Sequence, residues 1–384
     1  MISCGEASGD LYAGALASEL RRRDRGCRVV GFGGDRLRAA GADLVGEYRG
    51  LAVTGLTEAV RVLPRSYGMY RRLVARARAD RPDVFVAVDF PDFNFRVAAA
   101  LHRLGVPVVY YVSPQLWAWR PGRIHAMARF VSKVLVIFPF ERAIYEQAGI
   151  PVEFVGHPLL DLTRVTQPKD RFLTGLGLGA AAPTLALLPG SRVNELQTTV
   201  PVLSAALPLI GACVPRLQVV VARAPHLPAR LFAPLEAGRL PTAIVEGRTD
   251  DVLNAADVVI TASGTATVQT AIHGRPMVIV YRVSPLSFRL GRRFVRVQTF
   301  GMANLIAGRT IVPELIQDAF THDRVAAEAV RFFSDPAAAA RACEGLAEVR
   351  AKLGGPGATG RAADAVLGAI HARGSRAAAL QGNG

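Results

Sequence analysis

The sequence predicts an α/β protein built from two doubly wound domains, and three observations support this prediction. Short runs of Val, Ile and Leu alternate with amphipathic stretches of helical length, which is typical of a parallel sheet covered on both faces. The alternation stops at a polar segment near 151–170 and then starts again. The chain has 384 residues, 51% of them hydrophobic, and this is enough for two cores.

The first half of the chain predicts one such domain. Its first strand, 1–4, is unusually short for a buried strand. The further strands are expected at 29–32, 84–88, 108–112 and 134–138, and the helices at 10–24, 67–80, 94–104 and 140–148.

The second half repeats the pattern after the polar segment. Its strands are expected at 184–188, 217–221, 243–245, 258–260 and 277–280, followed by an Ala/Arg-rich helical region at 335–373 and a frayed tail at 374–384. The predicted domains are 1–165 and 166–345. Residues 346–384 form a C-terminal helix that packs back across the domains, with the frayed tail after it.

Composition narrows the classes of function. The net charge is +15, which suits anionic partners such as nucleic acid, membrane surfaces or phosphorylated substrates. Only three of the 46 basic residues are lysines, a bias typical of genome composition, and no aromatic-interleaved basic motif indicates nucleic-acid binding. The four scattered cysteines predict neither disulfides nor a zinc site, and histidine spacing predicts no metal.

No apolar run approaches the roughly 18 residues needed to span a bilayer, and the N-terminus does not resemble a signal peptide. The chain is therefore expected to work in the reducing cytoplasm.

Residues 257–281 form the most informative stretch, because strand, turn, helix and strand follow one another within 25 residues. The turn Ser263-Gly264-Thr265 places a helix N-terminus at the carboxyl end of a buried strand, where a diphosphate binds well. A second turn, at Pro189–Arg192, places Ser191 and Arg192 at a comparable strand end. Arginine can grip diphosphate oxygens with two hydrogen bonds. Each turn could by itself be an ordinary strand-to-helix connection.

Asp89 follows the apolar strand 84–88 directly and is the candidate general base. The alternative is a plain turn carboxylate. Asp92 stands just before a predicted helix and is expected to be its N-cap. The glycine turn at 5–10 would let a backbone approach a ligand, although an ordinary turn fits it equally well.

Two further features indicate a cleft wall and a membrane contact. Trp117 and Trp119 share one loop, where indoles can line a sugar or apolar pocket rather than pack in the core. The segments 56–78 and 282–296 combine arginines with apolar residues and could lie on an anionic membrane or be solvated helix faces. The predicted membrane-facing residues are Leu63, Tyr70, Arg71, Arg72 and Leu73.

Six motifs in a fixed order resemble the lipid-A-disaccharide synthase family of GT-B glycosyltransferases, family 19. They lie at 5–10, 88–94, 111–120, 187–192, 263–267 and 304–309, and the resemblance runs from residue 1 to about 372. It implies two Rossmann-like domains that face a central cleft. It also implies an inverting transfer that joins UDP-2,3-diacylglucosamine to 2,3-diacylglucosamine 1-phosphate and releases UDP, with no metal or other cofactor.

The resemblance also implies roles for individual residues. Asp89 would activate the acceptor's 6-hydroxyl in the N-terminal domain, whose cleft would be lined by Gly5, Glu6, Ser8, Trp117 and Trp119. In the C-terminal domain the donor site would contain Ser191, Arg192, Ser263, Gly264, Thr265, Gln269 and Asn304. Many GT-B enzymes have Glu where Gln269 stands, so this sequence departs from the wider fold at the proposed ribose contact. The enzyme would be peripheral at the cytoplasmic face of the inner membrane.

Two alternatives remain open at the level of sequence. Another GT-B enzyme acting on UDP-sugars, either an N-acetylglucosaminyltransferase or an epimerase, would share most of these features. The second alternative is a non-catalytic basic protein that binds membrane or nucleic acid. It would explain the positive net charge and would need no catalytic role for Asp89.

Overall fold

The computed structural model describes residues 1–49, 56–116, 122–283 and 299–381. Side chains are described in the same ranges, except at 56–62 and 373–381. The chain divides into two compact units. Unit 1 comprises the described residues of Met1–Asp161 and of Leu353–Gly384, and unit 2 comprises those between 162 and 352.

Unit 1 is built on a parallel sheet of seven strands in the order β3-β2-β1-β4-β5-β6-β7. The central strands are continuous apolar runs because both faces of the sheet are buried. The bounds are β1 Ile2–Cys4, β2 Val30–Gly33, β3 Asp43–Glu47, β4 Phe85–Val88, β5 Val108–Tyr111, β6 Lys133–Val136 and β7 Val152–Phe154.

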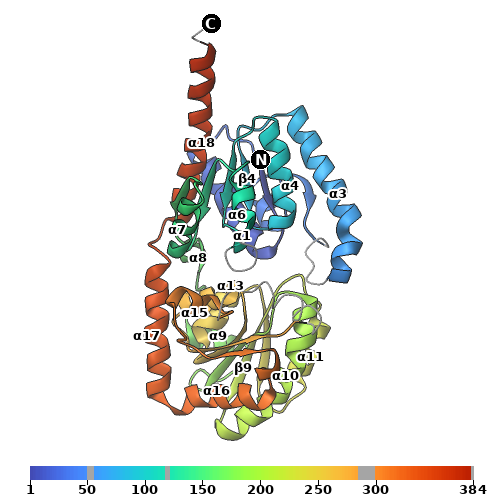
Figure 1. The fold of residues 1–384 in the computed structure, drawn as a ribbon. Coiled ribbons are helices and arrows are strands. Elements are labelled where there is room, and N and C mark those ends of the chain that lie inside the picture. Colours follow the sequence, from blue (N-terminus) through green and yellow to red (C-terminus); the bar gives the residue numbers. More distant parts are fainter. Residues whose placement is uncertain (50–55, 117–121, 284–298, 382–384) are drawn as a thin grey trace. The chain divides into compact units, whose positions relative to one another are not determined.

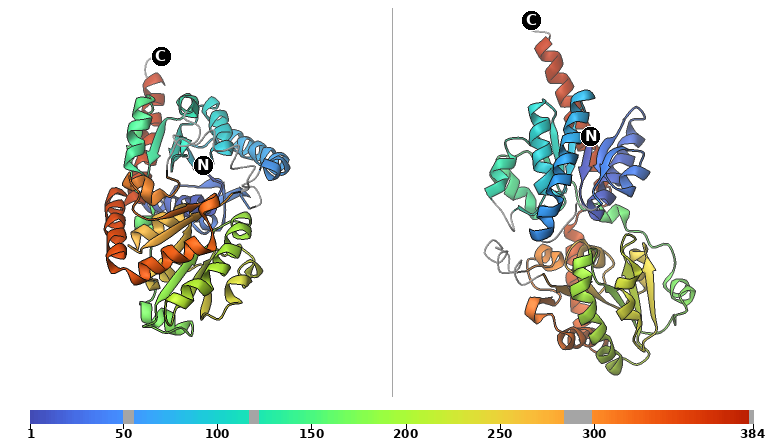
Figure 2. Two further views of the ribbon diagram at one scale, coloured as in Figure 1. Left: turned by 60° about the horizontal axis from the view of Figure 1, so that its bottom comes forward. Right: turned by 90° about the vertical axis from the view of Figure 1, so that its right-hand side faces the viewer.

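Helices cover both faces of this sheet (Figures 1 and 2). Helices α3 and α4 pack together, and α1 packs against the C-terminal helix α18. The bounds are α1 Ala7–Arg23, α2 Asp35–Ala39, α3 Leu56–Ala79, α4 Pro91–Arg103, α6 Gly122–Met127, α7 Pro139–Gln147, α8 Leu159–Leu162 and α18 Ala358–Gln381. The carboxylate of Asp161 accepts hydrogen bonds from the backbone N–H groups of Gly357 and Thr359 at 2.6 and 2.9 Å, which fixes the start of α18.

Unit 2 is built on a parallel sheet of six strands in the order β10-β9-β8-β11-β12-β13. Its strands are β8 Thr184–Leu188, β9 Gln218–Arg223, β10 Thr242–Glu246, β11 Val258–Ala262, β12 Met277–Tyr281 and β13 Glu314–Ile316. Its helices are α9 Lys169–Gly175, α10 Val193–Cys213, α11 Ala233–Glu236, α12 Thr249–Ala255, α13 Thr265–Ile272, α15 Met302–Ala307, α16 His322–Ser334 and α17 Pro336–Lys352.

Two doubly wound α/β units with parallel sheets confirm the predicted fold class. The strands that the sequence did not predict are β3, β7 and β13, which are the outer strands of their sheets. Each is only partly buried and carries a charged residue, so its apolar run is too short to be recognised. The predicted helical region at 335–373 is interrupted at 353–357, where Gly354, Pro356 and Gly357 separate α17 from α18.

Helix α10 is an exception to the prediction that no apolar segment is long enough to span a bilayer. Among the described residues it is the one helix whose length and composition would allow it to cross a membrane. Its Leu196, Val200, Leu203, Leu207 and Ile210 are buried, and it packs on α16. Buried core helices often have this length and composition, so α10 is weak evidence for a membrane span.

Candidate functional site

The candidate residues of unit 1 gather at the carboxyl edge of its sheet. Strands β1 and β4 are neighbours, and the strand order reverses between them, which is where open α/β sheets bind ligands. Gly5, Glu6 and Ser8 follow β1, and Asp89 follows β4, so the structure brings these four predicted residues to one edge. Gly5 leaves room for a neighbouring ring, because a Cβ there would lie 2.0 Å from Cγ of Phe90.

Asp89 sits in an unusual backbone conformation. Its φ angle is +46° and that of Phe90 is +50°, so two consecutive non-glycine residues are left-handed. Each such residue costs about 1–3 kcal/mol and persists only where its surroundings enforce it. The enforcing contacts are hydrogen bonds to the carbonyl oxygen of Asp89, from Asn94 Nδ2 at 2.8 Å and from Tyr110 Oη at 2.7 Å.

These supporting residues belong to a buried network that the sequence did not predict. Asn94 and Ser3 are fully buried, and Ser3 Oγ donates to Asn94 Oδ1 at 2.6 Å. Asn94 Nδ2 also approaches the carbonyl oxygen of Ser3 at 3.2 Å. The network therefore ties the end of β1 to the turn after β4. The available signal was an asparagine placed between two phenylalanines, Phe93 and Phe95, directly after a predicted strand and turn.

Asp92 is not the N-cap of α4, which corrects the prediction. The cap position is Phe90, and Asp92 lies inside the first turn of the helix. Its carboxylate accepts a hydrogen bond from Arg123 Nη1 at 2.6 Å, and its charge suits a helix N-terminus.

The candidate residues of unit 2 gather in the same way. Strands β8 and β11 are neighbours at the point where the order of the second sheet reverses. Ser191 and Arg192 follow β8, and the turn 263–265 follows β11. Glu195 organises the first of these turns, because its carboxylate accepts from Ser191 N and from Arg192 Nη1, both at 2.9 Å. The arginine is thus held at this edge, with 34% of its side chain exposed.

The turn at 263–265 presents an open helix start. Ser263 Oγ donates to the carbonyl oxygen of Phe300 at 2.9 Å, which anchors the turn. Gly264 has a φ of +138°, and a Cβ there would meet nothing within 4 Å, so space is open beside it. Thr265 begins α13 and is exposed. N–H groups at such a helix start favour an anionic ligand.

Gln269 lies one turn further along α13 and is held by Asp250. Its Nε2 donates to Asp250 Oδ1 at 2.7 Å, and the same oxygen contacts His273 Nε2 at 3.0 Å. Burial raises the pKa of Asp250, but hydrogen bonds from His273, the Arg164 backbone and Gln269 outweigh it, so its pKa lies below the usual value. A carboxylate acceptor directs the amide N–H₂ of Gln269 towards Asp250 and leaves its Oε1 as the acceptor on the other side.

Asn304 is fully buried, and its amide is engaged with its own domain. Its Oδ1 accepts from Ile311 N and Val312 N, and its Nδ2 donates to Val312 O and Glu314 Oε1. Glu314 in turn accepts from the N–H groups of Phe300 and Gly301 at 2.8 and 3.1 Å. Through Glu314, Asn304 thus helps to fix the backbone at Phe300, whose carbonyl oxygen accepts the hydrogen bond from Ser263. Its amide is occupied by these contacts rather than directed at a ligand.

The remaining predicted residues divide into three groups. Trp117 and Trp119 lie outside the described residues, as does most of 282–296. Leu63 is 50% exposed, Tyr70 is half-buried, and Arg71 and Arg72 are exposed. The prediction for Leu73 is wrong, because it is fully buried. Met69, Leu73 and Ala77 are spaced by four residues and form the inner stripe of α3.

The predicted structural role of His157 agrees with its surroundings. It is buried, and its Nδ1 accepts from Leu159 N at 3.2 Å. Burial lowers its pKa to about 3, so the ring is neutral at physiological pH. In the described ranges, His, Cys, Asp and Glu side chains form no group of three that could hold a metal ion.

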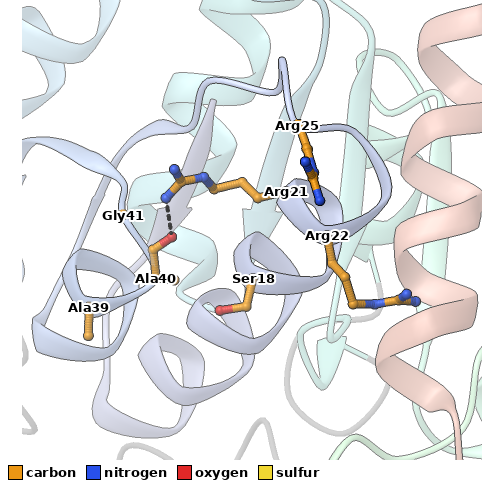
Figure 3. A pocket seen from close by; sticks show the side chains of 7 residues that line it. All are labelled: Ser18, Arg21, Arg22, Arg25, Ala39, Ala40 and Gly41. Carbon is orange, nitrogen blue, oxygen red and sulfur yellow. Dashed lines mark hydrogen bonds between the residues drawn. The ribbon is translucent and has the colours of Figure 1, made fainter.

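The hollow of about 410 Å³ shown in Figure 3 lies away from these residues. It is lined by Arg21, Arg22 and Arg25 at the C-terminal end of α1, which is the opposite edge of the sheet from Asp89. Arg21 donates to the carbonyl oxygen of Ala40 at 2.9 Å, and Arg22 pairs with Glu19. Its arginines thus serve the ends of α1 and α2.

Comparison with known proteins shows which of the functions left open by the sequence is supported. The family model described as lipid-A-disaccharide synthetase matches residues 1–354. The lipid-A-disaccharide synthase of Koribacter versatilis is 45% identical over 356 residues, which cover 92% of each chain. That of Geobacter sulfurreducens is 41% identical over 371 residues, which cover 96% of each chain.

Solved structures support the fold. A UDP-GlcNAc 2-epimerase from Neisseria meningitidis superposes with a TM-score of 0.67 and 11% identity, covering 95% of this chain and 98% of its own. The glycosyltransferase of kitacinnamycin gives a TM-score of 0.63 and 22% identity, covering 96% and 98%. At such low identity these neighbours show the fold alone, whereas the relatives in sequence show the family. The chain therefore belongs to the lipid-A-disaccharide synthase family and is a glycosyltransferase with the GT-B fold.

Proposed function

We propose that this enzyme joins UDP-2,3-diacylglucosamine to 2,3-diacylglucosamine 1-phosphate, with inversion at the anomeric carbon and release of UDP. The observation that carries the proposal is the left-handed turn that holds Asp89 at the point where the sheet order reverses. A carboxylate in this position is suited to act as a general base.

In the proposed reaction, Asp89 accepts the proton of the acceptor's 6-hydroxyl. The hydroxyl oxygen forms a bond to the anomeric carbon of the donor while the bond from that carbon to the diphosphate oxygen breaks. Attack from the face opposite the leaving group inverts the anomeric carbon. The Asn94 and Tyr110 hydrogen bonds keep the Asp89 backbone in one conformation, which lowers the cost of positioning the base.

Unit 2 would stabilise the departing UDP. Negative charge grows on the diphosphate as the glycosidic bond breaks. The Arg192 guanidinium, the Ser191 hydroxyl and the N-terminal end of α13 offer positive charge and hydrogen-bond donors to it. Gln269, oriented by Asp250, presents its Oε1 as an acceptor for a ribose hydroxyl. We propose on this basis that the reaction needs no metal ion.

Replacing Asp89 tests the proposal directly. Asp89→Asn keeps the shape of the side chain but cannot accept the proton of the acceptor's 6-hydroxyl. Turnover should therefore fall by a factor of about 10²–10⁴. Asp92→Asn is the matched control, because Asp92 is a second carboxylate three residues further along the chain, is exposed and pairs with Arg123 at the surface. UDP release and disaccharide formation from the two acylated substrates are measured for both variants, with circular dichroism to check folding.

The outcomes separate the alternatives. Full turnover in Asp89→Asn contradicts the proposed base. Epimerisation of the donor in place of a disaccharide product identifies a GT-B epimerase. Wild-type protein that forms no disaccharide from these substrates, but still binds vesicles or nucleic acid, supports a basic binding protein.

We propose further that the enzyme is cytoplasmic and contacts the inner membrane through the exposed part of α3. Leu63, Arg71 and Arg72 are exposed there, and they combine apolar surface with positive charge. The variant Leu63→Ser/Arg71→Gln/Arg72→Gln should sediment less with anionic vesicles. The control carries Leu209→Ser with Arg129→Gln and Arg341→Gln, which are exposed residues elsewhere. Equal sedimentation of the two variants contradicts the membrane contact.

A further inference from the structure

Helices α3 and α4 lie side by side on one face of the unit 1 sheet (Figure 2). A groove lies between them, lined by residues of both helices. Its volume is about 400 Å³, within the range of small-molecule pockets. It is lined by four aromatic residues, two small residues and two arginines, namely Tyr67, Tyr70, Phe93, Phe95, Ser66, Ala99, Arg96 and Arg103.

The floor and one wall of the groove are aromatic, so they offer an apolar surface to an acyl chain. Phe93 and Phe95 are 4% and 8% exposed and form the floor. Tyr67 and Tyr70 stack with ring centroids 6.0 Å apart, although Tyr67 is 59% exposed. An aromatic pair held at the surface above an apolar floor forms a wall that an acyl chain can contact.

The groove begins beside the proposed catalytic base. The Phe93 ring packs against Phe90, the residue after Asp89, with centroids 5.6 Å apart. The Phe95 ring packs edge-on against Tyr110 at 5.8 Å, and the Tyr110 hydroxyl donates to the Asp89 carbonyl oxygen. From Phe93 to Arg103 the helix rises about 15 Å, so the groove leads away from Asp89 along α4.

Positive charge lies at the rim of the groove. Arg96 and Arg103 are seven residues apart on α4 and are exposed on the same face. Neither has a carboxylate partner among the described residues. Arg96 is the nearer of the two to Asp89 along the helix, and it could pair with a phosphate without losing an existing ion pair.

We propose that the α3–α4 groove binds one acyl chain of the acceptor and that Arg96 binds the acceptor's phosphate, an inference that rests on the proposed function. The acceptor carries an apolar chain, a phosphate and a reactive hydroxyl on one sugar. The groove floor, Arg96 and Asp89 offer matching groups along a single helix and its preceding turn.

The test uses soluble acceptors of increasing acyl length, kept below the concentration at which they aggregate, with the donor fixed. Each methylene that enters the groove should lower KM by up to about fourfold in the wild type. Ala99→Trp fills the groove and should abolish this dependence on chain length. Ala75→Trp is the matched control, because Ala75 is exposed on α3 outside the lining.

Two further variants keep the test informative if Ala99→Trp folds poorly. Tyr67→Ser removes one aromatic ring from the wall of the groove. It should weaken the dependence of KM on the acyl-chain length of the acceptor and leave the dependence on the acyl-chain length of the donor unchanged. Arg96→Gln should raise KM about tenfold or more for the phosphorylated acceptor and little for its dephosphorylated form. Arg103→Gln, further from Asp89, should have the smaller effect.

The outcomes distinguish this inference from the proposed function. A wild type that makes no disaccharide refutes the proposed function itself. A wild type that is active, with the same chain-length dependence in well-folded Ala99→Trp or Tyr67→Ser, refutes the acyl groove. Variants with unchanged chain-length dependence but weaker vesicle sedimentation show that the surface serves membrane contact instead. Equal effects of Arg96→Gln on both acceptor forms refute the phosphate contact.

Discussion

Removing the Tyr110 hydroxyl tests how the left-handed turn at Asp89 is held. Tyr110 is fully buried on β5, and its Oη donates to the Asp89 carbonyl oxygen at 2.7 Å. The change Tyr110→Phe deletes this hydrogen bond and keeps the ring. The carbonyl still accepts from Asn94, so no buried acceptor loses all its partners.

The expected magnitude follows from one neutral hydrogen bond. Its loss should lower the free energy of unfolding by about 0.5–1.5 kcal/mol. In a unit of this size that shifts Tm by about 2–4 °C per kcal/mol. If all of this energy holds Asp89 in its reactive position, kcat falls by at most about tenfold, because 1.36 kcal/mol corresponds to a factor of ten. The KM for the UDP-sugar should stay unchanged.

The neighbouring tyrosine provides the control. Tyr111 is also fully buried on β5 but points to the opposite face, and its hydroxyl has no hydrogen-bond partner in the part of the chain that the structure describes. Tyr111→Phe should therefore be neutral or stabilising and leave kcat unchanged. Steady-state kinetics and thermal unfolding of both variants give the comparison. Equal kcat values for the two variants, with Tyr110→Phe less stable, would refute a positioning role for this hydrogen bond.

Three further predictions concern the donor turn, metal dependence and acid stability. Arg192→Gln should lower kcat/KM by about 10- to 100-fold, since a charged hydrogen bond contributes about 1.5–3 kcal/mol, and an unchanged value would remove Arg192 from the diphosphate site. Excess EDTA should leave the rate of UDP release unchanged, and a loss restored by one divalent cation would contradict the metal-free proposal. Because burial lowers the pKa of His157 to about 3, the unfolded state binds more protons below pH 6.5, so stability falls as the pH drops from 6.5 towards 3. Between pH 7 and pH 5 the wild type should lose about 2 kcal/mol more than His157→Asn in urea unfolding, and equal losses would show that His157 is not responsible.

Much of the candidate site could be predicted because its residues directly follow apolar strands. In parallel sheets these strand ends meet at one edge, so Asp89, Arg192 and the 263–265 turn could be assigned to carboxyl edges from strand order alone. The supporting residues could not be found this way. The side chains of Asn94 and Tyr110 donate hydrogen bonds to the backbone carbonyl oxygen of Asp89, and this contact depends on where each side chain points in the folded structure. The membrane prediction failed at Leu73 because an apolar residue in a helix can face either the core or solvent.

The sequence by itself determined the class of the molecule and its family. The alternation of apolar strands with helices requires parallel sheets with two covered faces, and motifs in fixed order along a chain need no coordinates to be recognised. Only the tertiary structure decided that Asn304 is engaged within its own domain, that Asp250 orients Gln269, and that α3 and α4 enclose a groove beside Asp89. The physical reason is that these contacts join residues on different elements, and their direction depends on how the side chains pack in space.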